Sequence, residues 1–374
     1  MNKMFTGCFD KIKDPRIDRT KKHRLIDIIA IAICAVIAGS EGWDEIEDFG
    51  NDQKDWLLEF LELPNGIPSH DTFSRVFSLL DSKNFQASCM EWMEAIRTLL
   101  PETVIAIDGK TLRGSARKRS GVKGLHIVNA WSCSNGITLG QLKVDGKSNE
   151  ITAVPELIKQ INIKGSVVTL DAMGCQEEIV NSICDAGSDY VIALKGNQGS
   201  LSDGVKDSFT LSDNKLKNLP QKSTSSPICG SHGRIDKRSV DVIEANNIKE
   251  LIDPRWTNLN SLVRVKYSRE EAGKVTKEER FYISSLPSIE AGRILGIVKK
   301  HWQVENCLHW SLDVAFSEDR CRIRDENAAT NLSWLRKFTL GLLKHEASFK
   351  AGIRRKRNKA SRSLAYLTKV ITGI

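Results

Sequence analysis

Five short β-rich runs between residues 100 and 200 most constrain what this chain can fold into. They are VIAI (104–107), LHIVNAW (125–131), ITLGQLKV (137–144), VVTL (167–170) and YVIAL (190–194). The first three are joined by turns, whereas helical patterns at 152–161 and 176–187 separate the last three. Strands joined by turns form antiparallel meanders, and strands joined through helices run parallel. The order βββαβαβ therefore predicts an α/β fold built on a mixed sheet.

The flanking regions show other patterns. Residues 1–95 are predicted to be entirely helical, because apolar residues recur there at helical spacing. Residues 200–285 are first polar and then alternate around a Glu-Ala-Gly-Lys turn, which predicts a hairpin at 262–285. Helical patterns follow at 288–313 and 328–343. We therefore expect a helical N-terminal domain (1–95) that could hold DNA, an α/β domain (100–349) with a β-rich insertion at about 200–285, and a basic C-terminal tail (350–374).

The charge distribution favours an acidic partner. The chain has 374 residues and a net charge of +8, with 40% hydrophobic and 27% charged residues, as is typical of a globular protein. Positive charge concentrates in two stretches, 11–24 and 350–374. Such runs can neutralise phosphates, although a solvated, partly disordered tail has the same composition. Nucleic acid is the partner that this pattern indicates most directly.

Cysteine usage and hydropathy predict a cytoplasmic protein. The nine cysteines are odd in number and include no C-x-x-C pair, which fits a reducing compartment. The first residues carry no apolar signal-peptide core. The apolar segment 25–38 is shorter than the roughly 20 residues that cross a bilayer, and it contains Asp27. We therefore expect a buried helix there and no membrane association.

Three acidic residues stand where chemistry could occur. Asp108 directly follows VIAI and Asp171 directly follows VVTL. Ligands of α/β sheets gather at the carboxyl ends of strands, so the two carboxylates can converge, although each could merely cap a turn. Glu305 is a third acid on a late helical pattern, with His301 and His309 four residues to either side on the same face. Three carboxylates suit Mg²⁺ or Mn²⁺, and two such ions about 3.5–4 Å apart support in-line phosphoryl displacement.

Two alternatives fit these residues less well. Zinc bound by the His-Glu-His stripe is disfavoured, because the His-x3-Glu-x3-His spacing matches no common zinc pattern. Nucleotide hydrolysis is disfavoured as well. Gly-Lys-Thr (109–111) and Gly-Lys-Ser (146–148) lack the P-loop glycine five positions earlier, where Val104 and Gln141 stand.

Several longer strings resemble one family of mobile elements. They include GSEGWDEIEDFG, LPNGIPSHDTFSRVF, AIDGKTLRGS, KSNEITAVPELI, VVTLDAMGCQ, ALKGNQG and HWQVENCLHWSLDVAFSEDRCRIR. In order and spacing they resemble the H-repeat-associated transposases, the ISAs group of insertion sequences, from about residue 10 to the end. IPSHDTF and LDAMGCQ are the most specific of these strings.

This resemblance implies a DDE transposase with an RNase H-like catalytic domain. Asp108, Asp171 and Glu305 would then be the catalytic acids that bind two Mg²⁺ or Mn²⁺ ions. The implied activity is cleavage of double-stranded DNA at the terminal inverted repeats of an insertion sequence, followed by joining to target DNA. The implied setting is a homo-oligomer in the bacterial cytoplasm, associated with the nucleoid. A catalytically silent DNA-binding relative and a nuclease that hydrolyses without joining remain as alternatives.

The resemblance departs from one related pattern. Many insertion-sequence transposases carry Tyr-x2-Arg-x3-Glu-x6-Lys around the third acid, and the matching positions here are Val298, His301, Glu305 and Leu312. A protonated His301 could take over a phosphate contact from the arginine, whereas Leu312 cannot replace a lysine.

The remaining candidates for DNA contact are polar residues at strand ends and in the basic C-terminal stretch. They are Lys147 and Asn149 in KSNEI, Lys195 and Asn197 in LKGNQ, His301, and the consecutive Arg354, Arg355, Lys356 and Arg357. Trp302 and Trp310 flank Glu305 and could stack on a base, although aromatic residues of helices are more often part of the core.

Overall fold

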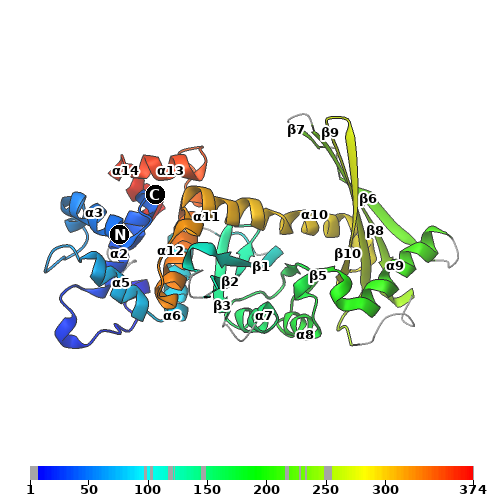
Figure 1. Cartoon of the computed structure of the whole chain (residues 1–374), viewed down its shortest axis with the longest axis horizontal. Helices are drawn as coiled ribbons and strands as arrows, with labels where there is room; N and C mark the ends of the chain where they lie inside the picture. The colour runs from blue at the N-terminus through cyan, green and yellow to red at the C-terminus, as the bar shows by residue number, and fades with distance from the viewer. Residues whose placement is uncertain are drawn as a thin grey trace.

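The computed structural model describes residues 7–96, 99–101, 104–116, 121, 123–144, 149–214, 219–226, 229–231, 234–247 and 255–373. It has three parts along its long axis: a helical part, a central sheet, and a β-rich part that ends in a projecting arm (Figure 1). Lys147 lies outside the described residues, so its predicted role stays a prediction.

The central sheet has the predicted order βββαβαβ. Its strands run in space as β3 (Ile137–Val144), β2 (Leu125–Ser132), β1 (Val104–Leu112), β4 (Val167–Leu170) and β5 (Asp189–Leu194). The first three pair antiparallel, whereas β4 lies parallel to both β1 and β5. The two crossovers are α7 (Glu150–Ile158) and α8 (Glu177–Asp185). Both crossover helices pack on one face of the sheet, in a core that includes Ile105 and Val168.

The β-rich insertion continues the same sheet. After α9 (Gly199–Asp213) come β6 (Gln221–Ser225), β7 (Cys229–Ser231), β8 (Arg234–Glu244), β9 (Ser261–Glu271) and β10 (Lys274–Ser284). β10 pairs with β5, which joins the insertion to the central sheet. The predicted hairpin is confirmed as β9–β10, whose turn places Ala272 and Gly273 at φ +49° and +76°, as a two-residue hairpin turn requires. We call β8, β9 and β10 together the arm (Figure 1).

The N-terminal region is helical, as predicted. It comprises α2 (Leu25–Ala38), α3 (Trp43–Asp52), α4 (Lys54–Leu58), α5 (His70–Leu79) and α6 (Ser82–Ile96). α2 is buried along nearly its whole length because it has almost no polar face to present to solvent. It packs against α3 and against α12 (Glu326–His345), whose residues 328–343 are all buried.

The expected C-terminal tail is instead two packed helices, α13 (Ile353–Ala360) and α14 (Leu364–Thr372). Leu367, Val370 and Ile371 form an apolar stripe on α14 and join the same hydrophobic core as α2 and α12. Helices from both ends of the chain therefore share one core. The boundaries 1–95, 100–349 and 350–374 stay predictions.

The helix predicted at 288–313 is interrupted. The structure has α10 (Ala291–His301), a π-helical turn η8 (Val304–His309) and α11 (Trp310–Ala315). α10 covers the sheet face opposite α7 and α8. Ile294 and Ile297 of α10 share a hydrophobic core there with strand residues Val104, Val167 and Val191. Single 3-10 turns occur at 18–20, 113–115, 172–174, 196–198, 288–290 and 318–320.

No single described helix is both long and apolar enough to cross a membrane. Taken together, α2 and α3 have the length and composition of a membrane span, but the pair is bent by 96°.

Candidate active site

Asp108 lies on β1, and Asp171 directly follows the neighbouring parallel strand β4 at the same end of the sheet. The register pairs Ala106 of β1 with Thr169 of β4. Asp108 and Asp171 each come two residues later, and side chains two apart in a strand share a face. That face is the one covered by α10, since Ile105 and Ile107 point into the core on the other side. β1 runs on to Leu112, so Asp108 lies within the strand at the point where β4 ends, rather than directly after the strand as predicted.

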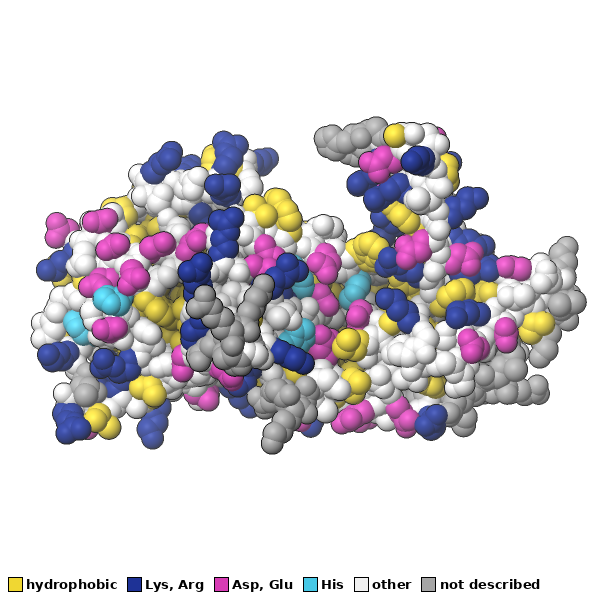
Figure 2. Space-filling view, in the orientation of Figure 1, with side chains coloured by type: hydrophobic (Ala, Val, Ile, Leu, Met, Phe, Trp, Pro, Cys, Tyr) yellow, Lys and Arg dark blue, Asp and Glu magenta, His cyan; other side chains and the backbone are white. Residues whose placement is uncertain are grey.

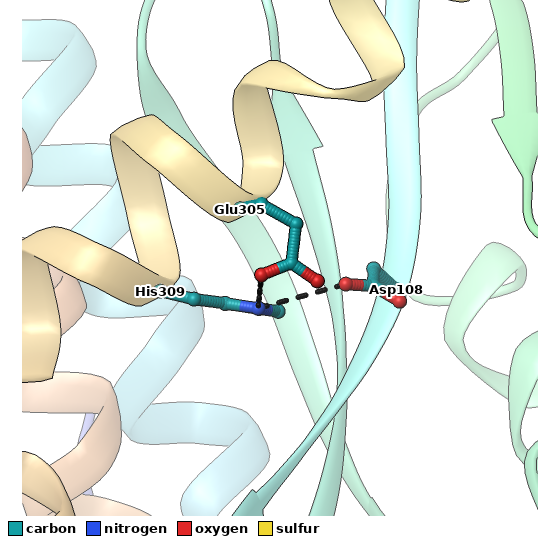
Figure 3. A group of neighbouring side chains, drawn as sticks. All are labelled: Asp108, Glu305 and His309. Carbon is teal, nitrogen blue, oxygen red and sulfur yellow. Dashed lines mark ion pairs between the residues drawn. The ribbon is translucent and has the colours of Figure 1, made fainter. Parts of the chain in front are cut away.

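The π-helical turn η8 brings Glu305 to Asp108. Atoms of Asp108, Glu305 and His309 that could bind a metal all lie within 4.8 Å of one another (Figure 3). His309 Nδ1 is 3.6 Å from Asp108 Oδ2 and 3.7 Å from Glu305 Oε2. A π-turn adds a residue to the helical turn and is frequent at functional sites. The fold thus gathers two predicted acids and a histidine in one place.

This cluster of acids favours a cation. The pKa of Asp108 is raised to about 7, first by burial and then by the charge of Glu305, with Asp171 and Glu150 adding to the effect. Like charges held together out of water resist ionisation until a cation joins them. The side chains of Asp108, Glu305 and His309 are 21%, 71% and 9% exposed, so the site opens to solvent on the Glu305 side.

His309 stands in this site as a neutral base. Its pKa is lowered to about 4, first by burial and then by the charges of Lys110 and Lys337, while Glu318 acts in the opposite direction. A neutral imidazole has a nitrogen lone pair for a metal, whereas a protonated one has none. Its Nε2 is buried without a hydrogen-bond partner in the structure.

A buried ionic layer lies beneath His309. Lys110, two residues after Asp108, forms an ion pair with Asp313. Its Nζ also lies 3.4 Å from Glu318 Oε2. Lys337 of α12 donates to Gln141 Oε1 at 2.6 Å and to Ser333 Oγ at 2.8 Å. These charges come from β1, α11, α12 and the turn at 318–320, so only the fold assembles them.

Asp171 has a structural role as well. Its Oδ1 accepts hydrogen bonds from the backbone N–H groups of Met173 and Gly174, at 3.0 and 3.3 Å. The turn-capping alternative is therefore real, but it uses one oxygen, and Oδ2 can face a ligand while the turn stays capped. Asp171 is exposed and lies near enough to raise the pKa of Asp108, although it is outside the three-residue group of Figure 3.

Comparison with known proteins identifies the family. The family described as "Transposase DDE domain" matches residues 99–342, and the one described as "DDE_Tnp_1-associated" matches residues 6–93. The "H repeat-associated putative transposase YhhI" of Escherichia coli K12 is 40% identical over 97% of this chain and 96% of its own length. The "Putative transposase YncI" of Escherichia coli O157:H7 is 39% identical over 97% of this chain and 93% of its own length. The chain belongs to the DDE transposases.

A solved structure also resembles this transposase, though distantly. It is the piggyBac transposase synaptic complex with hairpin DNA, whose sequence is 12% identical to this chain. The match covers 98% of this chain and 77% of the piggyBac chain, with a TM-score of 0.38.

The DNA-contact candidates of this transposase divide by exposure. Lys195, Arg354 and Arg355 are exposed. Asn149 caps α7 by accepting from Ile151 N at 3.0 Å, and Asn197 donates to Ala172 O at 2.7 Å, so both have structural partners.

Burial argues against two of the predicted contacts, Lys356 and Arg357, whereas a third, His301, stays a prediction. Lys356 and Arg357 are 6% and 4% exposed and donate to backbone carbonyls. Burial lowers the pKa of His301, which disfavours the protonated form that the predicted phosphate contact requires. Conversely, Trp302 and Trp310 are 43% and 62% exposed and are not core residues.

The donor set of the transposase site fits a divalent ion. Carboxylate oxygens are the usual ligands of Mg²⁺ and Mn²⁺, and an imidazole is better tolerated by Mn²⁺. The raised pKa of Asp108 is what neighbouring carboxylates show when burial and mutual repulsion make a bound cation favourable. Sequence reasoning placed His309 in a polar stripe but did not assign it to the site. The signal was its position four residues after Glu305.

We expect Asp108→Asn to stabilise the metal-free transposase above neutral pH. The folded chain holds the Asp108 proton more tightly than the unfolded chain does, so stability falls as pH rises from about 4 to about 7. Asparagine does not titrate and escapes this loss. Calorimetry in EDTA should show the variant about 2–4 kcal/mol more stable at pH 8, with a smaller advantage at pH 5. An advantage that is independent of pH would contradict this origin.

Proposed function

We propose that this transposase cuts DNA at the ends of an insertion sequence and joins the freed 3′ ends to target DNA. Asp108, Asp171 and Glu305 would hold two Mg²⁺ or Mn²⁺ ions, on a central domain of RNase H-like type. The observation that carries the proposal is the meeting of Asp108 and Glu305, from a central strand and a late helical turn, with ligand atoms within 4.8 Å. Asp171 follows the neighbouring strand β4, two residues after Thr169, which pairs with Ala106.

The ions would supply activation of the attacking oxygen and stabilisation of the leaving oxygen. In cleavage, the oxygen of a water molecule attacks the phosphorus while the bond between that phosphorus and the 3′ oxygen breaks. The products are a 3′-hydroxyl and a 5′-phosphate. In joining, that 3′-hydroxyl attacks a phosphorus of the target and displaces another 3′ oxygen. The carboxylates of Asp108, Asp171 and Glu305 would hold the ions and balance their positive charge.

Positive charge on two sides of the site supports a DNA partner. The molecule is hollowed between its helical part and the arm, and Lys and Arg side chains gather on both flanks, with Asp, Glu and His side chains between them (Figure 2). The exposed Arg354 and Arg355 belong to α13, and the partly exposed Arg234 and Arg269 belong to the arm. Lysine and arginine on such flanks neutralise backbone phosphates. A homo-oligomer that pairs the two ends of an element, acting at the bacterial nucleoid, completes the proposal.

The test uses the full chain and duplexes that end in the inverted repeats flanking its reading frame. With Mg²⁺ or Mn²⁺ we expect strand cleavage at the repeat, and with labelled target DNA we expect covalent joint products. Cleavage without joint products would replace the proposal by a hydrolytic nuclease. Binding without any metal-dependent cleavage would replace it by a silent DNA-binding relative.

We also expect His309 to bind one of the ions together with Asp108 and Glu305. His309→Gln should weaken Mn²⁺ binding roughly tenfold or more and remove the nitrogen coupling from the pulsed EPR spectrum of bound Mn²⁺. His126→Gln is the matched control, because His126 on β2 is outside the group of Asp108, Glu305 and His309 and contacts Glu150 at 2.6 Å and Thr111 at 2.8 Å. Nitrogen coupling that persists in His309→Gln would remove His309 from the metal site.

A further inference from the structure

A lysine of α12 contacts the turn that carries Glu305. Lys344 Nζ donates a hydrogen bond to the backbone carbonyl of Cys307 at 2.8 Å, although the two residues are 37 positions apart in the sequence. Cys307 lies within η8, two residues from both Glu305 and His309. The lysine side chain is partly buried, and burial lowers the pKa of Lys344 to about 8, so the amine is mostly charged at neutral pH. A charged donor from α12 therefore reaches into the turn between two proposed metal ligands.

The amine of Lys344 is also held from a second side. Its Nζ lies 4.3 Å from the centre of the ring of Trp131, a residue of β2 that is only 1% exposed. The face of an indole ring attracts a cation, and more strongly where water is excluded. β2 pairs with β1, the strand of Asp108. Lys344 thus connects the central sheet and α12 to η8.

The π-helical form of η8 lies between two halves of a helix that pack in different cores. The Trp310 N–H donates to Glu305 O, five residues back instead of the four of an α-helix. Ile294 and Ile297 of α10 pack on the central sheet, whereas Leu312 of α11 packs in the core shared with α2 and α12. Removing the extra residue from the turn would rotate one half against the other by about 100°. Side chains inserted into the hydrogen-bond ladder of a helix are a known cause of such local breaks.

We propose that Lys344 is a positioning residue, which holds η8 in its π-helical form and thereby keeps Glu305 and His309 at Asp108. The proposal rests on the proposed function for the presence of a divalent ion at these residues. Lys344 acts on the ion only through the carbonyl of Cys307. Without its amine, η8 loses the bond from α12, and the two ligands that η8 carries lose their fixed distance from Asp108.

Charge and position predict opposite results for Lys344→Met. Removing a positive charge from the surroundings of a cation site favours cation binding, because like charges repel. Loss of the group that orients metal ligands weakens cation binding, typically by about tenfold or more. We therefore expect Lys344→Met to bind Mn²⁺ about tenfold more weakly than the wild type. The nitrogen coupling of His309 should also be lost from the pulsed EPR spectrum of bound Mn²⁺.

A second measurement needs no metal. In EDTA, the backbone amides of η8 should exchange hydrogen faster in Lys344→Met than in the wild type, while exchange in the central sheet stays unchanged. Lys344→Gln, whose amide nitrogen ends one atom short of the lysine amine, should give the same weaker Mn²⁺ binding and faster exchange. It replaces Lys344→Met if the methionine variant does not fold.

Lys356→Met is the matched control. Lys356 is likewise a buried lysine that donates to backbone carbonyls, but its acceptors, Leu343 O and Glu346 O, lie at the end of α12 rather than in η8. This variant should lose stability and yet bind Mn²⁺ and exchange the amides of η8 as the wild type does.

Tighter or unchanged Mn²⁺ binding in Lys344→Met, unchanged exchange in η8, or an equal loss of Mn²⁺ binding in Lys356→Met would overturn the positioning role. Wild-type protein that binds no Mn²⁺ would overturn both this role and the proposed function. Failure of the proposed function alone would appear as the expected effects of Lys344→Met on Mn²⁺ binding and exchange, in a protein whose wild type never cleaves DNA.

Discussion

Asp171→Asn is expected to lower metal-dependent DNA cleavage by about a thousandfold or more while leaving DNA binding nearly unchanged. A metal ligand contributes several kcal/mol to the stabilisation of transition-state charge, and about 4 kcal/mol corresponds to a factor of 10³ in rate. The amide keeps an oxygen that can accept from Met173 N and Gly174 N, so the turn after β4 stays capped. The substitution therefore removes the charge and retains the local structure. Single-turnover cleavage of end-labelled duplex with Mg²⁺, alongside anisotropy binding in Ca²⁺, measures both quantities.

Asp171→Ala separates the two roles of this residue. It removes both the charge and the cap, so we expect the same loss of cleavage with an additional loss of stability of about 1 kcal/mol. Asp171 would be only a cap if Asp171→Asn cleaved DNA normally while Asp171→Ala neither folded nor bound DNA. In that case the metal site would consist of Asp108, Glu305 and His309 alone.

The sequence predicts the sheet well because strand order depends on short-range patterns. Apolar runs, the turns between them and the two amphipathic segments α7 and α8 are all local, and together they specify which strands pair and in which direction. The same patterns single out Asp108 and Asp171 by position. The exact end of β1 could not be predicted, because β1 pairs with β2 up to Leu112, and that pairing continues well beyond β4.

Other parts of the site depend on contacts between distant segments. The neutral state of His309 depends first on its burial and then on the charges of Lys110 and Lys337, which come from β1 and α12. The π-turn at η8 has no signature in the sequence that distinguishes it from an ordinary helix. The hydrogen bond from Lys344 to Cys307 needs α12 and η8 together. For such features sequence spacing gives candidates, and only tertiary packing decides among them.

Arg357 illustrates how composition can mislead. In the sequence it belongs to a run of four basic residues and predicts contact with phosphate. In the structure its guanidinium donates to Val36 O at 2.9 and 3.2 Å, to Ser40 O at 3.2 Å and to Ala315 O. Its Cζ also lies 4.2 Å from the centre of the Phe316 ring. Val36 and Ala315 belong to the last turns of α2 and α11, where carbonyls are short of partners within the helix; the Val36 carbonyl also accepts from the C-cap Gly39 N–H at 3.4 Å. Arg357 therefore caps two helix ends.

We expect Arg357→Met to reduce the free energy of unfolding by about 2–4 kcal/mol, because buried carbonyls lose charge-assisted hydrogen bonds while methionine retains much of the volume. Burial lowers the pKa of Arg357 only to about 10, so the native charge persists at neutral pH. The control is Arg354→Met on the same helix, an exposed position that should leave stability within about 0.5 kcal/mol of wild type. Urea unfolding measures both.

In DNA binding we expect the opposite order of effects for the same two variants, with the larger loss in Arg354→Met. Arg354 is exposed and can reach phosphate, so Arg354→Met should weaken binding to duplex DNA. The dependence of binding on salt concentration should also fall, because methionine neutralises no phosphate and therefore releases no counterion. Arg357→Met, measured at a temperature where it is fully folded, should bind as the wild type does. The reverse pattern, with stability reduced at position 354 and DNA affinity reduced at position 357, would mean that the C-terminal basic run works as the extended tail that its composition suggests. The division of neighbouring arginines into one that holds the fold and one that faces DNA would then be wrong.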